Sequence, residues 1–226
     1  MDSGASPRRV PHVRLLQPPE VAKAADVLAQ AFDDDPVADF IFRSDSGRAR
    51  GLRRFFTIQL RHLYLPYGEV WTTGGGPAVP EAAGAFDIPD VAGVAMWSPP
   101  DRPAFTRRDR IRMLPILGSL LSGRQPLEAL RLLAAVDAAR PRRPLWYLAT
   151  LGTAPVHQAR GIGSSLLGPV LRRADVEGTE SYLESSKESN IAFYHHHGFE
   201  VVEEIRTSRA APTLWAMLRQ PRPSDR

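Results

Sequence analysis

The stretch APVHQARGIGSSLLGPVLRRAD, residues 154–175, places Gly161 and Gly163 where an amphipathic helix begins. Glycine costs about 1 kcal/mol relative to alanine inside a helix, which suggests that close access to the backbone matters at this turn. The first turn of a helix carries unpaired N–H groups and the positive end of the helix dipole, and together these bind anions. Taken alone, the stretch indicates either an anion site or an ordinary junction between a loop and a helix.

The residues before the turn favour the anion site. PLWYLATLGTAP, residues 144–155, reads as a strand that leads directly into it. A strand, a glycine turn and an amphipathic helix in this order form a cradle for a pyrophosphate. A dinucleotide-binding fingerprint does not fit, because the turn comes late in the chain and Leu166 stands at the third glycine position. A GxxxxGK[ST] loop is absent from the sequence.

The rest of the chain must position this turn, and its patterning predicts an α+β fold with a mixed sheet of six or seven strands. The acidic run Asp33–Asp35 before Pro36 is expected to break the first long helix. The expected strands lie at 13–16, 68–73, 91–100, 145–153, 181–185, 199–207 and 212–219, and the expected helices at 19–32, 48–65, 160–177 and 189–197, with an arginine-rich two-helix insertion at 101–143. We expect one domain over 12–219, flanked by flexible tails at 1–11 and 220–226.

Composition narrows the function classes. With 226 residues, of which 43% are hydrophobic, the chain is long enough to bury a full core. It has no cysteine, which excludes disulfides, a thiol nucleophile and cysteine-ligated metals and fits a cytoplasmic protein. The net charge of +4 suits a phosphate-bearing ligand. No arginine cluster is interleaved with aromatic residues and no zinc-finger spacing occurs, so nucleic acid is not the expected partner. The strongest apolar run, at 113–121, is too short to cross a membrane.

Two motifs resemble those of the GCN5-related N-acetyltransferases (GNAT). QARGIG, residues 158–163, is similar to the family's acetyl-coenzyme A signature, and YLESSKESNIAFYHHHGFEVV, residues 182–202, is similar to its second motif. Within the family, the chain is most similar to puromycin-type, antibiotic-modifying acetyltransferases. The resemblance implies a largely antiparallel sheet with helices on both faces, in which strand 145–153 splays away from strand 181–185. It also implies acetyl-CoA as co-substrate and no metal.

The resemblance assigns a set of cofactor-binding residues. The pantetheine arm would pair with the free backbone of Thr150, Leu151, Gly152 and Thr153, where the oxyanion donors also lie. The pyrophosphate would bind the turn formed by Gln158, Ala159, Arg160, Gly161, Ile162, Gly163 and Ser164, with the Arg160 side chain adding charge. Ser164 or Ser165 could add a hydroxyl bond, or either could be a polar surface residue. Ala159 departs from the glycine found in many members, a change that the motif tolerates.

The resemblance also implies catalytic residues, each with a structural alternative. Tyr194 is the expected general acid for the leaving thiolate, or else a core aromatic residue under Gly198 and Phe199. Glu184 is the expected general base, or else a carboxylate that orders the loop 185–189. Asn190 caps the following helix or bonds the pantetheine arm. Trp97 and Tyr147 either line the acceptor pocket or belong to the core; if the strand alternates, Trp146 points away from it.

Three consecutive histidines, His195–His197, replace a more usual Glu–Arg pair. Consecutive helical side chains fan out about 100° apart and cannot clasp one ion, so a solvated helix end is expected instead of a metal site. The predicted function is acetyl transfer to the primary amine of a small molecule, by a monomer or homodimer. The alternatives are a protein acetyltransferase and a non-catalytic CoA-binding module. We expect segments 33–36, 48–65 and 101–143 to enclose the acceptor pocket, unless 101–143 packs on the far side of the sheet.

Overall fold

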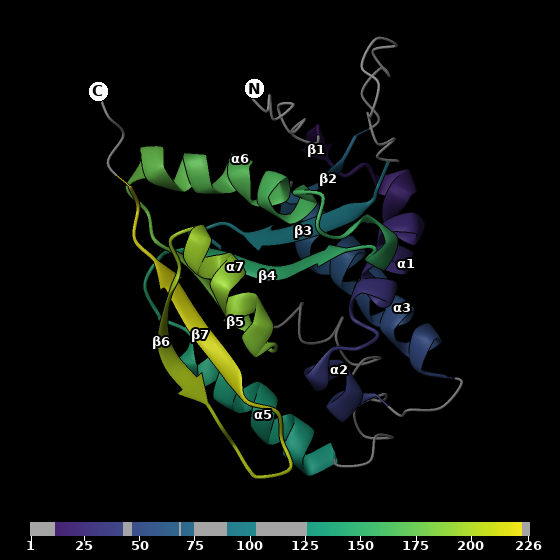
Figure 1. The fold of residues 1–226 in the computed structure, drawn as a ribbon, viewed down its shortest axis with the longest axis vertical. Coiled ribbons are helices and arrows are strands. Elements are labelled where there is room, and N and C mark those ends of the chain that lie inside the picture. The colour runs from purple at the N-terminus through teal and green to yellow at the C-terminus, as the bar shows by residue number, and fades with distance from the viewer. Residues whose placement is uncertain (1–11, 43–46, 68, 75–89, 103–125, 223–226) are drawn as a thin grey trace, which may run out of the picture.

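Seven strands form one mixed sheet in the structure, a computed structural model that describes residues 12–42, 47–67, 69–74, 90–102 and 126–222. The strands are β1 (Val13–Leu15), β2 (Val70–Thr73), β3 (Gly93–Ser98), β4 (Trp146–Thr153), β5 (Ser181–Ser185), β6 (Glu200–Ile205) and β7 (Leu214–Arg219). Their order across the sheet is β1-β2-β3-β4-β5-β7-β6 (Figure 1). Neighbouring strands run antiparallel except β4 and β5, which are parallel. The predicted fold class is confirmed.

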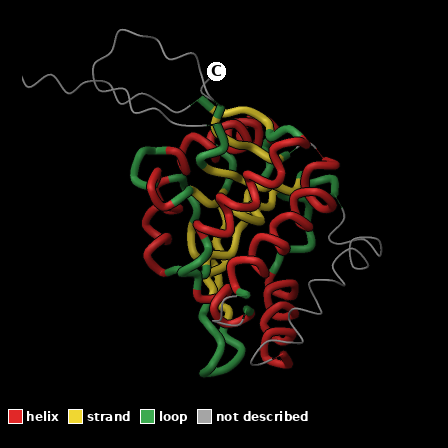
Figure 2. The backbone as a smooth tube through the Cα atoms, turned by 90° about the vertical axis from the view of Figure 1, so that its right-hand side faces the viewer, coloured by secondary structure: helices red, strands yellow, loops and turns green. Residues whose placement is uncertain are grey.

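Helices cover both faces of this sheet (Figure 2). They are α1 (Val21–Ala31), α2 (Pro36–Ile41), α3 (Arg48–Ile58), α5 (Pro126–Ala139), α6 (Ile162–Glu177) and α7 (Ile191–His196). α3 continues as a π-helical segment, Gln59–Tyr64, where the sequence predicted one uniform helix over 48–65. The first of the two helices expected in 101–143, and the termini 1–11 and 223–226, lie outside the described residues.

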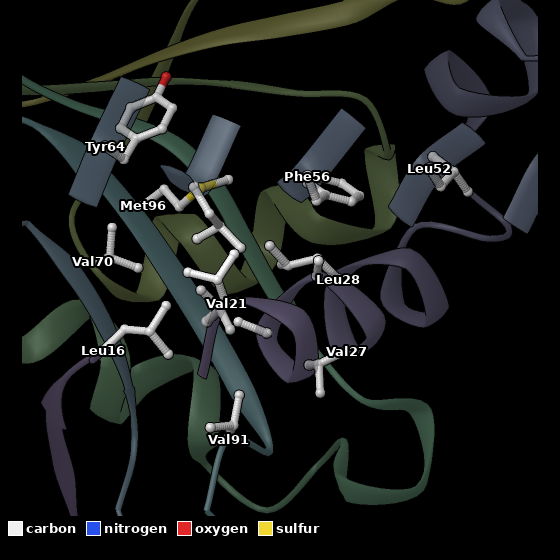
Figure 3. Close-up of a cluster of buried hydrophobic side chains, with 14 of the residues drawn as sticks. Leu16, Val21, Val27, Leu28, Leu52, Phe56, Tyr64, Val70, Val91 and Met96 are labelled. Carbon is white, nitrogen blue, oxygen red and sulfur yellow. The ribbon is translucent and has the colours of Figure 1, made fainter. Parts of the chain in front are cut away.

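One face of the sheet is covered by α1 and α3. Leu28 on α1 and Phe56 on α3 are fully buried against Met96 of β3, at the centre of the cluster shown in Figure 3. A short 3₁₀ turn, Pro18–Glu20, precedes α1, and the Glu20 carboxylate accepts a 2.9 Å hydrogen bond from the Gln17 backbone N–H. This capping box fixes the start of α1 next to the end of β1.

The opposite face of the sheet is covered by α6 and α7. The apolar positions of α6 that the sequence predicted are all buried: Ile162, Leu166, Leu167, Val170, Leu171 and Ala174. Burying a leucine, isoleucine or valine side chain of this kind contributes roughly 1.5–3 kcal/mol. Gly178 ends the helix in a left-handed conformation with φ +63°. Because this stripe holds the body of α6 firmly, the first turn of the helix stays fixed at the end of β4.

A short helix, α2, follows α1 where the sequence predicted only a break. Asp35 is the N-cap, and its carboxylate accepts hydrogen bonds of 2.9 Å from the N–H groups of Val37 and Ala38. Pro36 occupies the first helical position, where its missing N–H costs nothing. The acidic run therefore ends one helix and starts the next.

Candidate active site

The turn between β4 and α6 has a strained backbone. Gly161 has φ +77°, and Ala159 has φ +59°, a left-handed conformation that costs an alanine about 1–2 kcal/mol. Gly161 has open space around its missing side chain, so its conformation is what requires glycine. At Gly163 the reason differs, since a Cβ there would lie 3.2 Å from the Phe193 ring of α7. The two glycines thus meet separate needs, a left-handed turn and close packing of α7.

A cleft of about 660 Å³ extends from this turn to the end of β5. The α1–α2 loop, the second half of β4, the turn, the β5–α7 loop and α7 form its walls. The structure brings most of the predicted site residues into its lining: Thr150, Leu151, Gly152, Thr153, Gln158, Ala159, Gly161, Ile162, Gly163, Ser164, Glu184, Asn190 and Tyr194. Arg160, Trp97 and Tyr147 do not line this cleft.

β4 and β5 separate along the cleft. Their parallel pairing runs from Trp146 and Ser181 to Leu148 and Leu183, and no pair follows on the β5 side of β4. On its other edge, β4 stays paired to β3 as far as Thr153, with one extra residue, Ala149, between the pairs Trp97–Leu148 and Met96–Thr150. This bulge bends β4. The backbone of 149–153 therefore presents a free edge to the cleft, able to hydrogen-bond an extended ligand.

Glu184 lies at this splay, on β5, and its carboxyl group has an unusual environment. Burial raises its pKa from an ordinary 4.5 to about 7, although Tyr147, Arg140 and Tyr182 partly oppose that rise. The Tyr147 hydroxyl donates a 2.9 Å hydrogen bond to Oε2. The other oxygen, Oε1, is buried and has no hydrogen-bond partner among the described residues. A carboxyl group in the wall of the cleft, with a pKa near neutrality, is suited to accept a proton.

Tyr194 enters the cleft from α7. The side chain is buried, and its ring packs edge-on against Phe193 and Phe199 at centroid distances of 5.2 and 6.0 Å. Burial raises the pKa of its hydroxyl above the ordinary value of 10, so the phenol keeps its proton at neutral pH. Tyr194 thus has the core contacts of a structural aromatic residue and also a position in the cleft wall.

The smaller polar residues near the turn differ in whether their side chains bond to the protein backbone. Asn190 makes no side-chain cap for α7, although it occupies the N-cap position, so its amide stays available to the cleft. The Ser165 hydroxyl donates back to the Gly161 carbonyl at 3.1 Å, and Gln158 donates to the Thr153 carbonyl at 3.2 Å. Of the two serines considered from the sequence, it is Ser164 that lines the cleft.

Trp97 and Tyr147 lie on opposite faces of the sheet. Trp97 is fully buried in the cluster formed with α6, so the structure gives it the core position and not a pocket position. Tyr147 is half-buried on the other face, between Glu184 and the guanidinium of Arg140, which stacks 3.7 Å from its ring centroid. Trp146 points away from Tyr147, as strand alternation predicted.

The α1–α2 loop is fastened to the β5–α7 loop across the cleft. Lys187 Nζ lies 2.6 Å from the Asp34 carboxylate, and the Ser186 hydroxyl donates to Asp35. Asp35 is buried because it also caps α2. The third acidic side chain, Asp33, lies 3.7 Å from Nε of Arg48, so all three carboxylates in 33–35 are engaged within the protein and are not free to receive a cationic amine. The contacts with Ser186 and Lys187 join residues about 150 positions apart, and no local pattern in the sequence indicates them.

The three histidines diverge. His195 is exposed, and its Nδ1 lies 3.2 Å from Glu200, whereas His197 is half-buried with its Nε2 3.0 Å from the Ser164 hydroxyl. The predicted solvated helix end therefore holds for His195 and His196, and is wrong for His197. Among the described residues, no three histidine or acidic side chains gather closely enough to hold a metal ion.

Sequence comparison agrees with this geometry. The profile of the acetyltransferase (GNAT) family matches residues 85–199, just over half of the chain. The chain belongs to the GNAT family. It is an N-acetyltransferase, and membership implies acetyl-CoA as its co-substrate. An uncharacterised N-acetyltransferase of Schizosaccharomyces pombe is 26% identical over 219 residues, which span 92% of this chain and 83% of that protein.

The other similar proteins differ in how much of each chain the match covers. A probable serine/threonine-protein kinase of Dictyostelium discoideum is 32% identical over 79 residues, but these cover 34% of this chain and only 11% of the kinase. A Corynebacterium glutamicum structure described as histone acetyltransferase HPA2 and related acetyltransferase superposes with a TM-score of 0.67 at 23% identity, covering 96% of this chain and all of that one. The Drosophila melanogaster polyamine N-acetyltransferase gives 0.57 at 13% identity, covering 92% and 98%. Both structures share the fold.

Within the described ranges, no helix combines the length and the apolarity that crossing a bilayer requires.

Proposed function

We propose that the chain transfers the acetyl group of acetyl-CoA directly to the primary amine of a small molecule. The observation that carries this proposal is Glu184, a buried carboxyl group with a pKa of about 7 and one unpartnered oxygen, placed in the cleft beside the free edge of β4. An amine must lose a proton to attack a thioester, and a base that titrates near the working pH serves this step best.

The residues of the chain divide the chemistry between them. Bound acetyl-CoA would supply the activated acetyl thioester. Glu184 takes one proton from the neutral amine as the nitrogen lone pair forms the new C–N bond. Backbone N–H groups of 149–153 stabilise the oxyanion that develops as the carbonyl is attacked. Tyr194 keeps its proton in the resting enzyme and gives it to the thiolate as the C–S bond breaks.

The left-handed turn would hold the pyrophosphate. Its backbone curls through positive φ at Ala159 and Gly161 before the first turn of α6, and successive N–H groups in this conformation form a concave anion site. The dipole of the 16-residue helix adds to it. Arg160 contributes its backbone to the turn, while its side chain lies outside the cleft lining.

A small acceptor fits the walls of the cleft better than a peptide does. The loop 33–36 is fastened across to Ser186 and Lys187, and on the face that carries Glu184, helix α5 packs over Tyr147 and Tyr182. We infer that these contacts leave less room for an extended peptide backbone than for a compact amine. The motifs that resemble those of puromycin-type enzymes suggest a more specific acceptor, an aminonucleoside or another antibiotic amine. The agmatine-acetylating Drosophila enzyme shows that the shared fold can serve a small amine.

Acceptor screening tests this proposal. Purified protein is mixed with acetyl-CoA and with each member of two panels, one of polyamines, arylalkylamines and aminonucleosides, the other of lysine-containing and N-terminally free peptides. Thiol release is then recorded with Ellman's reagent. We expect release with at least one small amine and little with peptides. Robust acetylation of peptides, with none of free amines, would contradict the small-molecule assignment, and tight acetyl-CoA binding without any turnover would support a CoA-binding module instead.

A further inference from the structure

The cofactor turn has a side-chain contact that comes from α7. His197, directly after the last residue of α7, places its Nε2 3.0 Å from the hydroxyl oxygen of Ser164. Ser164 is the third residue of α6 and lines the cleft. This contact links the histidine motif to the first turn of α6, where the unpaired N–H groups of the helix lie.

His197 is held through its ring and through its backbone. It packs edge-on against Phe193 with ring centroids 4.9 Å apart, and Phe193 in turn packs on Gly163. The backbone carbonyl of His197 accepts a 3.0 Å hydrogen bond from Nε of Arg219, a buried side chain that is also paired to Asp175 at 2.8 Å. A ring fixed in this way directs Nε2 at one partner, the Ser164 hydroxyl.

The direction of the hydrogen bond decides what Ser164 can do. If Nε2 carries a hydrogen, it donates to the serine oxygen and leaves the serine proton for an anion in the cleft. If Nε2 is unprotonated, the serine proton is used on the imidazole, and the hydroxyl has only lone pairs to offer. An anion therefore selects the tautomer, or the imidazolium, in which His197 is the donor.

We propose that His197 is a positioning residue for acetyl-CoA, which orients the Ser164 hydroxyl toward the pyrophosphate at the α6 N-terminus and takes up a proton as the ligand binds. This inference rests on the proposed function, because it requires the pyrophosphate to occupy the turn. It gives the last histidine of the motif a role in binding, whereas His195 at the other end of the motif pairs with Glu200 away from the cleft.

The charges around His197 explain the coupling to protons. His196 lies on the same helix, and Arg219 and Arg222 approach from β7 and the segment after it. Burial first, and then these neighbouring groups, lower the pKa of His197 below the ordinary 6.5, although Asp175 on α6 neutralises part of the arginine charge. A bound pyrophosphate would favour the imidazolium and raise that pKa. The affinity for acetyl-CoA should therefore increase as the pH falls below neutrality.

Calorimetric titration with acetyl-CoA, on the full chain, tests the proposal with four variants. His197→Phe keeps the ring that packs on Phe193, and His197→Gln keeps a side-chain donor. Ser164→Ala removes the hydroxyl, and His195→Gln is the matched control on the exposed side of the same helix. We expect dissociation constants about tenfold weaker for His197→Phe and Ser164→Ala, the size of one charge-assisted hydrogen bond, smaller losses for His197→Gln, and no change for His195→Gln.

Two further readouts separate positioning from packing. The double variant Ser164→Ala/His197→Phe should bind no more weakly than either single variant, since the two side chains act as one unit. Between pH 8 and pH 5.5, wild type should gain roughly threefold more affinity than His197→Phe does. Additive losses, or a loss with an unchanged pH dependence, would reassign His197 to packing. Wild-type protein that fails to bind acetyl-CoA would instead contradict the proposed function itself.

Discussion

Replacing Glu184 by glutamine should make the protein more stable and nearly inactive. The folded protein holds the pKa of this carboxyl group at about 7, against an ordinary 4.5, because the group is buried. Each tenfold difference in proton affinity corresponds to about 1.4 kcal/mol, so ionised Glu184 costs about 3 kcal/mol of folding free energy. Glutamine has nearly the same shape, can still accept the hydrogen bond from Tyr147, and carries no charge to desolvate.

The sign of the pH dependence follows from the same difference. Since the folded state binds the proton more tightly than the unfolded state, the stability contributed by this group is highest below pH 4.5, falls between 4.5 and about 7, and is lowest above 7. The Glu184→Gln variant lacks this decrease. Urea unfolding should therefore give a variant about 3 kcal/mol more stable than wild type at pH 8, and of similar stability at pH 4.5.

The catalytic activity of Glu184→Gln should fall, although its stability rises. Loss of a general base typically lowers kcat by roughly 100- to 10,000-fold, while acetyl-CoA affinity should be retained because Glu184 is placed for the acceptor amine. Glu188→Gln, an exposed change in the loop after β5, is the matched control and should alter neither property. If Glu184→Gln proves less stable than wild type at pH 8, the carboxylate orders its loop as a structural group, and the argument for a base is refuted.

Substitutions at three other positions give distinct outcomes. Tyr194→Phe keeps the ring contacts with Phe193 and Phe199 and removes only the proton donor, so kcat should fall roughly 10- to 1000-fold with little change in acetyl-CoA affinity; unchanged turnover, with chemistry shown to be rate-limiting, would leave Tyr194 a core residue. Gly163→Glu should abolish acetyl-CoA binding in calorimetry, because it adds bulk and negative charge at the phosphate site. Gly163→Ala, whose Cβ meets the Phe193 ring at 3.2 Å, should lose far less affinity. Equal affinities for wild type and Gly163→Glu would show that the phosphate binds elsewhere. Ala159→Gly should raise the free energy of unfolding by about 1 kcal/mol, since φ +59° suits glycine better than alanine; a loss of stability in urea unfolding would show that the strain is absorbed differently.

Local patterns predicted the parts of the site that are continuous in sequence. The strand, the turn with Gly161 and the apolar stripe of α6 follow one another along the chain, so spacing alone revealed them. The α2 helix was missed although its signal was present, because an aspartate followed by proline is as good a helix start as a helix break.

Contacts made across the fold could not be predicted in this way. All six residues of β3 are buried, so no alternation showed that Trp97 belongs to the α6 face. The hydrogen bond from Tyr147 to Glu184 joins adjacent strands across 37 positions of sequence, and it depends on the register of that parallel pair. His197 was expected in solvent because a helix end considered alone has no neighbour, whereas the fold places it against Ser164.

Acetyl-CoA bound in this cleft should give its acetyl group directly to a small amine, with no acetylated form of the protein in between. Mass spectrometry of both protein and acceptor, in one reaction with isotope-labelled acetyl-CoA, tests it most directly. Without acceptor, the protein mass should stay unchanged, and on addition of a reactive amine, the label should appear on that amine in step with free CoA. A labelled acetyl group attached to the protein before the acceptor is added, and then passed on to the amine, would contradict direct transfer.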